Sequence, residues 1–256
     1  MRKVFFLAPA AAAAAGLVLS ACGGAGGLDA VAKAADKSSS AGSEHVSFTG
    51  DVVTGTQVIK LSGSGDFQQQ PRLGQASFTI SGGPVKGTID EVMKGWTFYM
   101  RSPFFARVLP QGKSWVSLDV KTLGSKLGVD VGQITQTSPT DVLPALKKAG
   151  SVKKVGAETV GGVQTTHYQA VIDPAKLPNG AQLAKAHVSP FPVDVWIGDD
   201  DGLLRRLTIS EAATENGQTA TTRMTMDLSN YGEQVNVTVP PADQTLDLTG
   251  LTTRLP

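Results

Sequence analysis

The sequence is poor in cysteine, histidine and net charge, and each shortage excludes a class of protein. A single cysteine among 256 residues rules out an intrachain disulfide and a cysteine-cluster metal site. The 23 basic and 22 acidic residues give a formal net charge of +1, so no basic field exists to attract nucleic acid. No second long apolar run follows the N-terminal one, so the mature chain is predicted to be tethered to a membrane and not integral to it.

Recognisable catalytic motifs are also absent from the sequence. His45, His167 and His187 are isolated, without the spacing of a His-Glu-x-x-His metal site. No Gly-x-Ser-x-Gly elbow, phosphate-binding loop or dinucleotide fingerprint occurs, and Asp199 to Asp201 predict a hairpin turn in preference to a calcium loop. The sequence therefore predicts no enzyme, no metal and no cofactor. A secreted hydrolase stays open as an alternative, which would require the fold to bring a serine, a histidine and an aspartate together.

The N-terminus predicts the location of the protein. Arg2 and Lys3 precede an apolar, alanine-rich run over residues 4–19, which is typical of a secretory signal peptide over residues 1–21. The ending Leu-Ser-Ala-Cys matches a bacterial lipobox, which predicts cleavage before Cys22 and a diacylglycerol on its sulfur. The lost Arg2 and Lys3 leave 21 basic and 22 acidic residues, a mature charge of −1. Two or three acyl chains should anchor the chain stably on the outer side of the cell membrane.

A glycine-rich segment over residues 22–27 is predicted to be a flexible spacer. Leu28, Val31, Ala32 and Ala35 follow at helical spacing and predict a short amphipathic helix ending near Ala41. Residues 28–256 are long enough for one domain with its own core, and we expect only one.

From His45 on, apolar residues occur at every second position, which indicates antiparallel strands with one apolar and one polar face. The alternating apolar positions include Val46, Phe48, Ile59, Leu61, Phe67, Ala76, Phe78 and Ile80. Gly63 and Gly65 lie inside a strand and predict strong bending or bulges.

The second half of the chain is predicted to alternate between small helices and further strands. Asp119 can cap a helix that ends before Gly128, and the Ser138-Pro139 pair begins a second helix that ends at Gly150. The strand pattern resumes at Val152, turns at Gly161-Gly162 and continues through Val193 to Ile197 and Met224 to Leu228. Val235, Val237 and Val239 predict a last strand, after which Pro240-Pro241 ends the sheet and the remainder lies on the surface.

The segment from Lys94 to Leu127 departs from the usual pattern of strands and loops. Trp96 to Arg101 alternates as a half-buried strand, and Lys113 to Leu118 is predicted to be its return strand. The connection between them, Ser102 to Pro110, is apolar where a loop would normally be polar. This loop is either packed as a lid on the sheet or exposed for an apolar partner.

Roughly ten strands give one long apolar face, and only a few short helices are available to cover it. We therefore expect a mainly β (α+β) fold with a curved antiparallel sheet and short helices over its concave face. Either side chains fill that face as a dry core, or an apolar cavity remains for a ligand.

Several segments together resemble the LppX/LprA/LprF/LprG lipoproteins of actinobacteria, which are similar in fold to the carriers LolA and LolB. These segments are the lipobox at Cys22, Trp96-Thr97-Phe98-Tyr99-Met100 with Pro103-Phe104-Phe105, Val193-Asp194-Val195-Trp196-Ile197, Leu203-Leu204-Arg205-Arg206, and Met226-Asp227-Leu228-Ser229-Asn230-Tyr231-Gly232-Glu233 with Pro240-Pro241. The resemblance implies an open half-barrel closed by helices over an apolar cavity for acylated lipids or glycolipids. It implies no catalytic residues.

The leading hypothesis is thus a membrane-anchored, monomeric lipoprotein that binds and transfers an acylated lipid or glycolipid. The alternative is an envelope sensor whose apolar loop binds a protein partner. The residues expected to form the floor, lid and helical cover of the cavity are Phe98, Met100, Phe104, Phe105, Val108, Leu109, Leu123, Leu127, Val142, Leu143 and Leu146.

Overall fold

The computed structural model describes residues 24–82, 86–105, 109–127, 152–173, 190–215 and 218–249. At a few of these positions (24–25, 124–127, 213–215 and 218) it describes the backbone alone. The signal peptide, the lipobox cysteine and the predicted helix over residues 138–150 lie outside the described residues.

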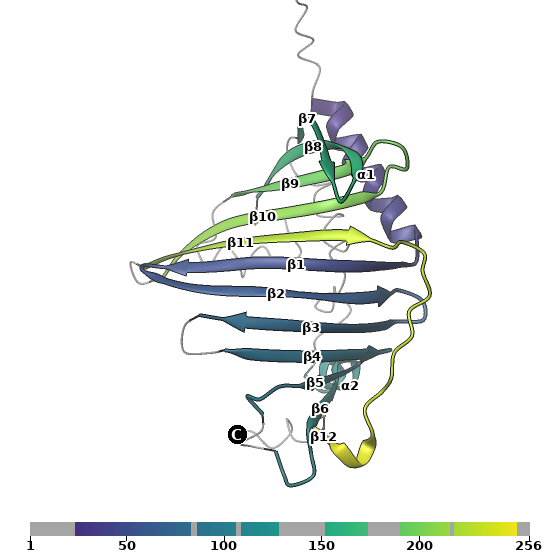
Figure 1. Ribbon diagram of the computed structural model, residues 1–256, viewed down its shortest axis with the longest axis vertical. Coiled ribbons are helices and arrows are strands. Elements are labelled where there is room, and N and C mark those ends of the chain that lie inside the picture. The colour runs from purple at the N-terminus through teal and green to yellow at the C-terminus, as the bar shows by residue number, and fades with distance from the viewer. Residues whose placement is uncertain are drawn as a thin grey trace, which may run out of the picture.

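The described strands form one sheet in the order β12-β6-β5-β4-β3-β2-β1-β11-β10-β9-β8-β7. Neighbouring strands are antiparallel except for β12, which is parallel to β6. Figure 1 shows the central strands nearly level and the strands at both ends of the sheet turning away steeply, so the sheet is curved and open. The predicted fold class, a mainly β chain with an open curved sheet and few helices, is confirmed.

The first half of the sheet is a continuous meander that follows helix α1. Its elements are α1 (Gly24–Ser40), β1 (Ser43–Thr54), β2 (Gln57–Gln68), β3 (Leu73–Ser81), β4 (Gly87–Lys94), β5 (Thr97–Arg101), β6 (Trp115–Asp119) and α2 (Val120–Leu127). The second half comprises β7 (Val152–Val160), β8 (Val163–Ile172), β9 (Phe191–Gly198), β10 (Leu204–Glu215), β11 (Gln218–Ser229), the single turn η4 (Ala242–Gln244) and β12 (Thr245–Asp247).

Two local predictions are confirmed, one by a hydrogen bond and one by backbone angles. The backbone N–H of Thr122 donates to Oδ1 of Asp119 at 2.8 Å, which is the expected N-cap of α2. Gly161 and Gly162 form a two-residue hairpin with φ angles of 55° and 82°, which glycine adopts without steric cost. A third prediction differs from the structure, because helix α1 begins at Gly24 and not at Leu28, so residues 24–27 of the predicted flexible spacer are helical.

Two predictions about the C-terminal part are wrong. Val235, Val237 and Val239 form no strand; the chain from residue 230 instead crosses the ends of the strands, as the yellow segment of Figure 1 shows. It contacts the sheet through both backbone and side chains: the N–H of Gly232 donates to the carbonyl of Ser43 at 3.1 Å, and the N–H of Val235 donates to Oε1 of Gln68 at 3.3 Å. The chain beyond Pro241 does not simply lie on the surface, because β12 adds a parallel strand beside β6.

The glycines of β2 do not mark bulges, since β2 pairs with β1 and β3 in unbroken register. They permit close packing. A Cβ atom at Gly63 would lie 2.6 Å from Cζ of Phe48, and one at Gly65 would lie 2.7 Å from Cβ of Ala76. Both distances are shorter than real carbon contacts, so these positions exclude any larger residue unless the strands move.

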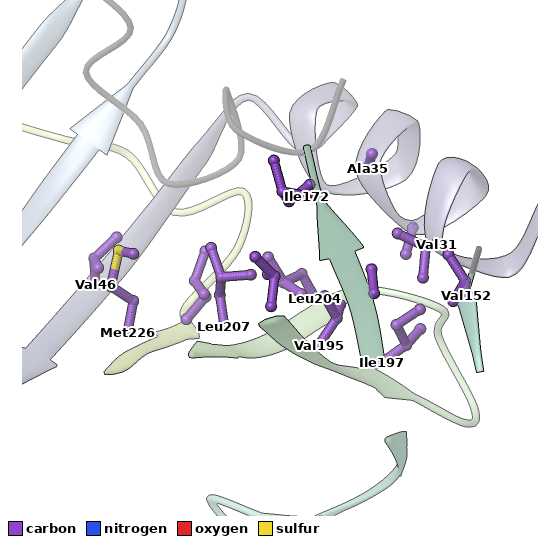
Figure 2. Close-up of a cluster of buried hydrophobic side chains, with 14 residues drawn as sticks. Val31, Ala35, Val46, Val152, Ile172, Val195, Ile197, Leu204, Leu207 and Met226 are labelled. Carbon is purple, nitrogen blue, oxygen red and sulfur yellow. The ribbon is translucent and has the colours of Figure 1, made fainter. Parts of the chain in front are cut away.

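The main core lies between α1 and one face of the sheet (Figure 2). Val31, Ala34, Ala35 and Ser38 form the buried stripe of α1, with Ala34 and Ser38 in place of the predicted Ala32. Ser38 is satisfied although it is buried, because its Oγ accepts a hydrogen bond from the N–H of Leu204 at 2.9 Å. The helix packs mainly on β7, β9 and β10, which lie toward one end of the sheet.

Candidate functional site

The apolar face continues from the α1 core across the centre of the sheet. Antiparallel partners point to the same side, so the registers trace rows of side chains across the strands. One row joins Met226 of β11, Phe48 of β1, Gly63 of β2 and Phe78 of β3. A neighbouring row joins Val46, Gly65, Ala76, Glu91 and Met100.

A cavity of about 320 Å³ opens on this face, beyond the part that α1 covers. Strands β1, β2, β3, β4 and β11 all contribute to its lining, which comprises Val46, Phe48, Leu61, Phe67, Phe78, Glu91, Met224 and Met226. The volume is at the lower end of the range of small-molecule sites, and an apolar lining with one polar group is typical of them.

Aromatic rings and glycines together shape the floor of this cavity. The rings of Phe48 and Phe78 lie 5.0 Å apart between centroids and are tilted by 43°, although a whole strand, β2, runs between their own strands. They meet because Gly63, the partner of both residues, has no side chain. Gly74 similarly admits Phe67, whose Cδ1 would lie 2.9 Å from a Cβ at that position. The glycines therefore create a hollow within an otherwise packed face.

Glu91 is the one charged residue in the lining. Its partners in the register, Ala76 and Met100, are both apolar. Within the described part of the chain its carboxyl group makes no hydrogen bond or ion pair. Burial alone raises the pKa of the Glu91 carboxyl above its usual value, because desolvation disfavours the charged form.

This raised pKa predicts a pH dependence of stability that depends on one side chain. Between the ordinary pKa and the raised one, the folded chain holds more protons than the unfolded chain, so the free energy of unfolding falls as pH rises through that window. Glu91→Gln removes the titration, so the free energy of unfolding of the variant should increase relative to that of the parent chain as pH rises. Urea unfolding of both lipid-free proteins from about pH 4 to pH 8 measures this difference, and parallel curves would contradict the prediction.

The floor residues predicted from the sequence, Phe98 and Met100, point to the cavity side of the sheet. Met100 pairs with Glu91 and Phe98 pairs with Met93, so both share the face of the cavity. Neither belongs to the cavity lining itself, which ends at β4. They extend the same apolar surface by one more strand.

The predicted lid loop is only partly described and does not close over the cavity in the described residues. Phe104 is 38% exposed, and its ring lies near Gly87 at the start of β4. Phe105 is half-buried, and its carbonyl accepts a hydrogen bond from the N–H of Leu109 at 3.0 Å. Leu109 borders a separate recess of about 450 Å³ that also includes Asp90 and Arg101, and Val108 lies outside the described residues.

The helical residues of the predicted cover are described to different extents. Leu123 is half-buried on α2, which contacts β5 and β6. Leu127 is the last residue of α2, and its side chain is not among those described. Val142, Leu143, Leu146 and the lipidation residue Cys22 all lie outside the described residues.

The strand alternation in the sequence predicts that the apolar cavity residues are strand residues but does not mark them as a site. Phe48, Phe67 and Phe78 lie beside glycines of neighbouring strands, a relation that only the strand register defines, so no local signal in the sequence marks them as a site. Glu91 could have been found as the carboxyl group at an inward position between Ile89 and Met93. Met224 and Met226 complete the site from a distant part of the sequence.

The opposite face contains an arrangement that could suggest a hydrolase. His45 Nδ1 lies 2.6 Å from Oδ1 of Asp66, and its Nε2 lies 3.4 Å from Oγ of Ser47. The second distance is too long for a good hydrogen bond, and Ser47 does not line the recess of about 260 Å³ that His45 and Asp66 border. Ser47 is exposed in the middle of β1, which pairs with β2 and β11. Its strand setting lacks the free N–H groups of an oxyanion hole, so we interpret the cluster as a surface polar network.

His167 forms a second polar network on the same opposite face. Its ring nitrogens lie 3.0 Å from Oε1 of Glu158 and 2.9 Å from Oδ1 of Asp194. The ring stacks on Trp196 at 4.1 Å, and Trp196 Nε1 donates to Oε2 of Glu158 at 2.9 Å. That hydrogen bond, followed by the one from His167, holds the pKa of Glu158 below its usual value. These contacts fasten β7, β8 and β9 together.

Two further findings concern the described residues alone. No cluster of three or more histidine, cysteine, aspartate or glutamate side chains there is arranged to hold a metal ion. Neither of the two α-helices in these ranges has the length and hydrophobicity needed to cross a bilayer.

An open, curved sheet with a helix over part of its apolar face and a cavity on the same face is a half-barrel. The chain belongs to the LppX_LprAFG lipoprotein family, whose model matches residues 27–237. The match includes the strands that line the cavity.

Solved structures show the same fold at low sequence identity. The lipoprotein LppX of Mycobacterium tuberculosis is similar with a TM-score of 0.53 and 18% identity, over 82% of this chain and 97% of that one. LprF of Mycobacterium bovis is similar with a TM-score of 0.52 and 18% identity, over 84% and 97% of the two chains.

Relatives with similar sequences occur in Streptomyces. A 31.2 kDa Streptomyces griseus protein from the rplA-rplJ intergenic region is 33% identical over 155 residues, which are 53% of this chain and 48% of that protein. A Streptomyces coelicolor protein that is named as a lipoprotein is 28% identical over 209 residues, which are 77% of this chain and 60% of that protein. The chain thus spans less than two thirds of either relative.

Proposed function

We propose that this protein is a membrane-anchored envelope lipoprotein that holds the acyl chain of a lipid or glycolipid in the cavity and transfers it. The observation that carries the proposal is the cavity of about 320 Å³ with seven apolar side chains and one carboxyl group in its lining. Membership of a lipoprotein family supports the anchor, for which Cys22 is the proposed attachment site.

The energetics of burial favour an acyl chain as the guest. Each methylene group removed from water contributes about 0.8 kcal/mol. A segment of six methylene groups would thus contribute about 5 kcal/mol before the cost of ordering the chain. The apolar floor offers no groups that would need polar partners, apart from Glu91 at its edge.

Uptake and release require that the guest can leave the cavity. We propose that the loop over residues 102–110, with Phe104, Phe105, Val108 and Leu109, covers the bound chain. Leu123, Leu127, Val142, Leu143 and Leu146 are proposed as the helical part of the same cover, and Phe98 and Met100 as an extension of the floor. The exposure of Phe104, 38%, supports a loop that is not locked into the core.

Leu61→Trp tests the proposal, because Leu61 lines the cavity and is only half-buried. The indole should fill the space that an acyl chain would occupy, and we expect the lipid that co-purifies with the chain to fall to less than about half. Native mass spectrometry of the chain carrying Cys22→Ala measures this lipid without a contribution from the anchor.

The matched control is Val58→Trp, which puts the same indole on the same strand at a position that is 41% exposed and outside the lining. Equal lipid content in both variants would place the lipid elsewhere. A parent chain free of lipid would remove the support for a carrier and favour the envelope-sensor alternative.

A further inference from the structure

The Glu91 carboxyl group lies at one end of the apolar cavity. The strands that line the cavity follow one another in the sheet in the order β4, β3, β2, β1 and β11. β4 contributes Glu91 and no other lining residue, whereas Met224 and Met226 of β11 form the opposite end. The cavity is therefore polar at one end and apolar along the rest of its length.

A ligand that fills the cavity must also contact this carboxyl group. The neighbours of Glu91 in the registers of β3 and β5 are Ala76 and Met100, and neither can form a hydrogen bond with it through its side chain. An apolar chain packed over Glu91 would remove water from the carboxyl group without offering a hydrogen bond in its place. Such a loss is costly for a buried polar group. A guest that supplies its own polar group at this end avoids that cost.

The chemistry of a carboxyl group indicates which polar group fits. A carboxyl group can accept a hydrogen bond in either protonation state, but it can donate one only when it is protonated. Burial raises the pKa of Glu91 without abolishing its capacity to accept. A hydrogen-bond donor on the guest is therefore complementary to Glu91 in both states.

We infer that Glu91 accepts a hydrogen bond from a hydroxyl or amino group in the polar head of the acylated ligand, while the acyl chain extends toward Met224 and Met226. This inference rests on the proposed function and adds the ligand class and its orientation. Lipids whose polar head lacks such a donor would be disfavoured.

Two pairs of lipids that differ in one donor test the inference. Dioleoylglycerol has a free hydroxyl group that its acetate ester lacks, and dioleoyl phosphatidylethanolamine has N–H donors that the corresponding phosphatidylcholine lacks. We expect the parent chain with Cys22→Ala to prefer the donor-bearing lipid by about tenfold in at least one pair. The pair that shows the preference tells whether the hydroxyl or the amino group is recognised. Binding can be measured by displacement of a fluorescent fatty acid.

Glu91→Leu should abolish that preference and bind the acetate ester at least as well as the parent chain does. Glu91→Gln keeps a carbonyl acceptor and should keep part of the preference for the hydroxyl group. Glu211→Leu on β10, outside the cavity lining, is the matched control and should discriminate like the parent. Urea unfolding of each variant confirms that it is folded.

The outcomes separate the two proposals. If the parent chain binds all four lipids without preference, or if Glu91→Leu discriminates as the parent does, the assignment of Glu91 is overturned and lipid binding stands. If the parent binds none of them and carries no lipid, the proposed function falls, and the assignment of Glu91 falls with it.

Discussion

Replacement of Leu207 by alanine is expected to lower the free energy of unfolding by about 2–5 kcal/mol. Leu207 has no exposed surface and lies in the core cluster between α1 and the sheet. Its register partners, Val195 of β9 and Met226 of β11, are also buried, so the surroundings cannot easily collapse into the space left behind. The change in the midpoint of urea unfolding, at an unchanged slope, measures the loss.

Val58→Ala is the control for the loss of Leu207, since Val58 also lies in a strand but is 41% exposed. This substitution should change the free energy of unfolding by less than about 0.5 kcal/mol. Comparable losses in the two variants would show that α1 and the sheet do not form the cooperative core in solution. The expected contrast would instead show that the buried cluster under α1 contributes stability that an exposed strand position does not.

The parts of the fold that the sequence predicts well are those that short-range physics determines. The alternation of apolar and polar residues identifies the strands of the meander because one face of the sheet is buried and the other is exposed to solvent. Asp119 and the Gly161-Gly162 pair predict a helix start and a hairpin because each acts within a few residues. Such signals need no knowledge of distant partners.

The mistaken predictions have long-range causes. The valines from Val235 to Val239 alternate like a strand, but no edge is free beside them, because β1 to β4 are already paired with one another. The chain therefore crosses the strand ends and reaches the far edge, where β6 accepts β12. Pairing between residues 115–117 and 245–247 cannot be predicted from a local pattern.

The cavity could be expected from the sequence, but its position could not. An excess of apolar sheet face over helical cover indicates that some of the face stays open. The location depends on which rows of the sheet contain glycine, and those rows are defined only by the register. Glu91 occupies an inward position in the sequence pattern, but only the strand order shows that it lies at one end of an apolar cavity.

Replacement of Gly63 by alanine is expected to lower the free energy of unfolding by about 1–3 kcal/mol, although only one methyl group is added. That methyl group would lie 2.6 Å from Cζ of Phe48 and would meet the backbone carbonyl of Ser77. The ring can turn away, but the carbonyl belongs to β3 and cannot move without disturbing the ladder. Urea unfolding measures the loss, and the near-ultraviolet circular dichroism of the aromatic side chains should change with it.

Gly156→Ala on β7 is the matched control, because a Cβ at Gly156 has no atom within 4 Å and should leave stability nearly unchanged. The contrast also bears on the cavity. Because Gly63 lets Phe48 and Phe78 lie 5.0 Å apart, a methyl group there would push a ring toward the space proposed for the acyl chain. Gly63→Ala should therefore lose bound lipid as well as stability, whereas Gly156→Ala should keep both. If Gly63→Ala were as stable as the parent chain, close packing around this glycine could not be what shapes the floor of the cavity.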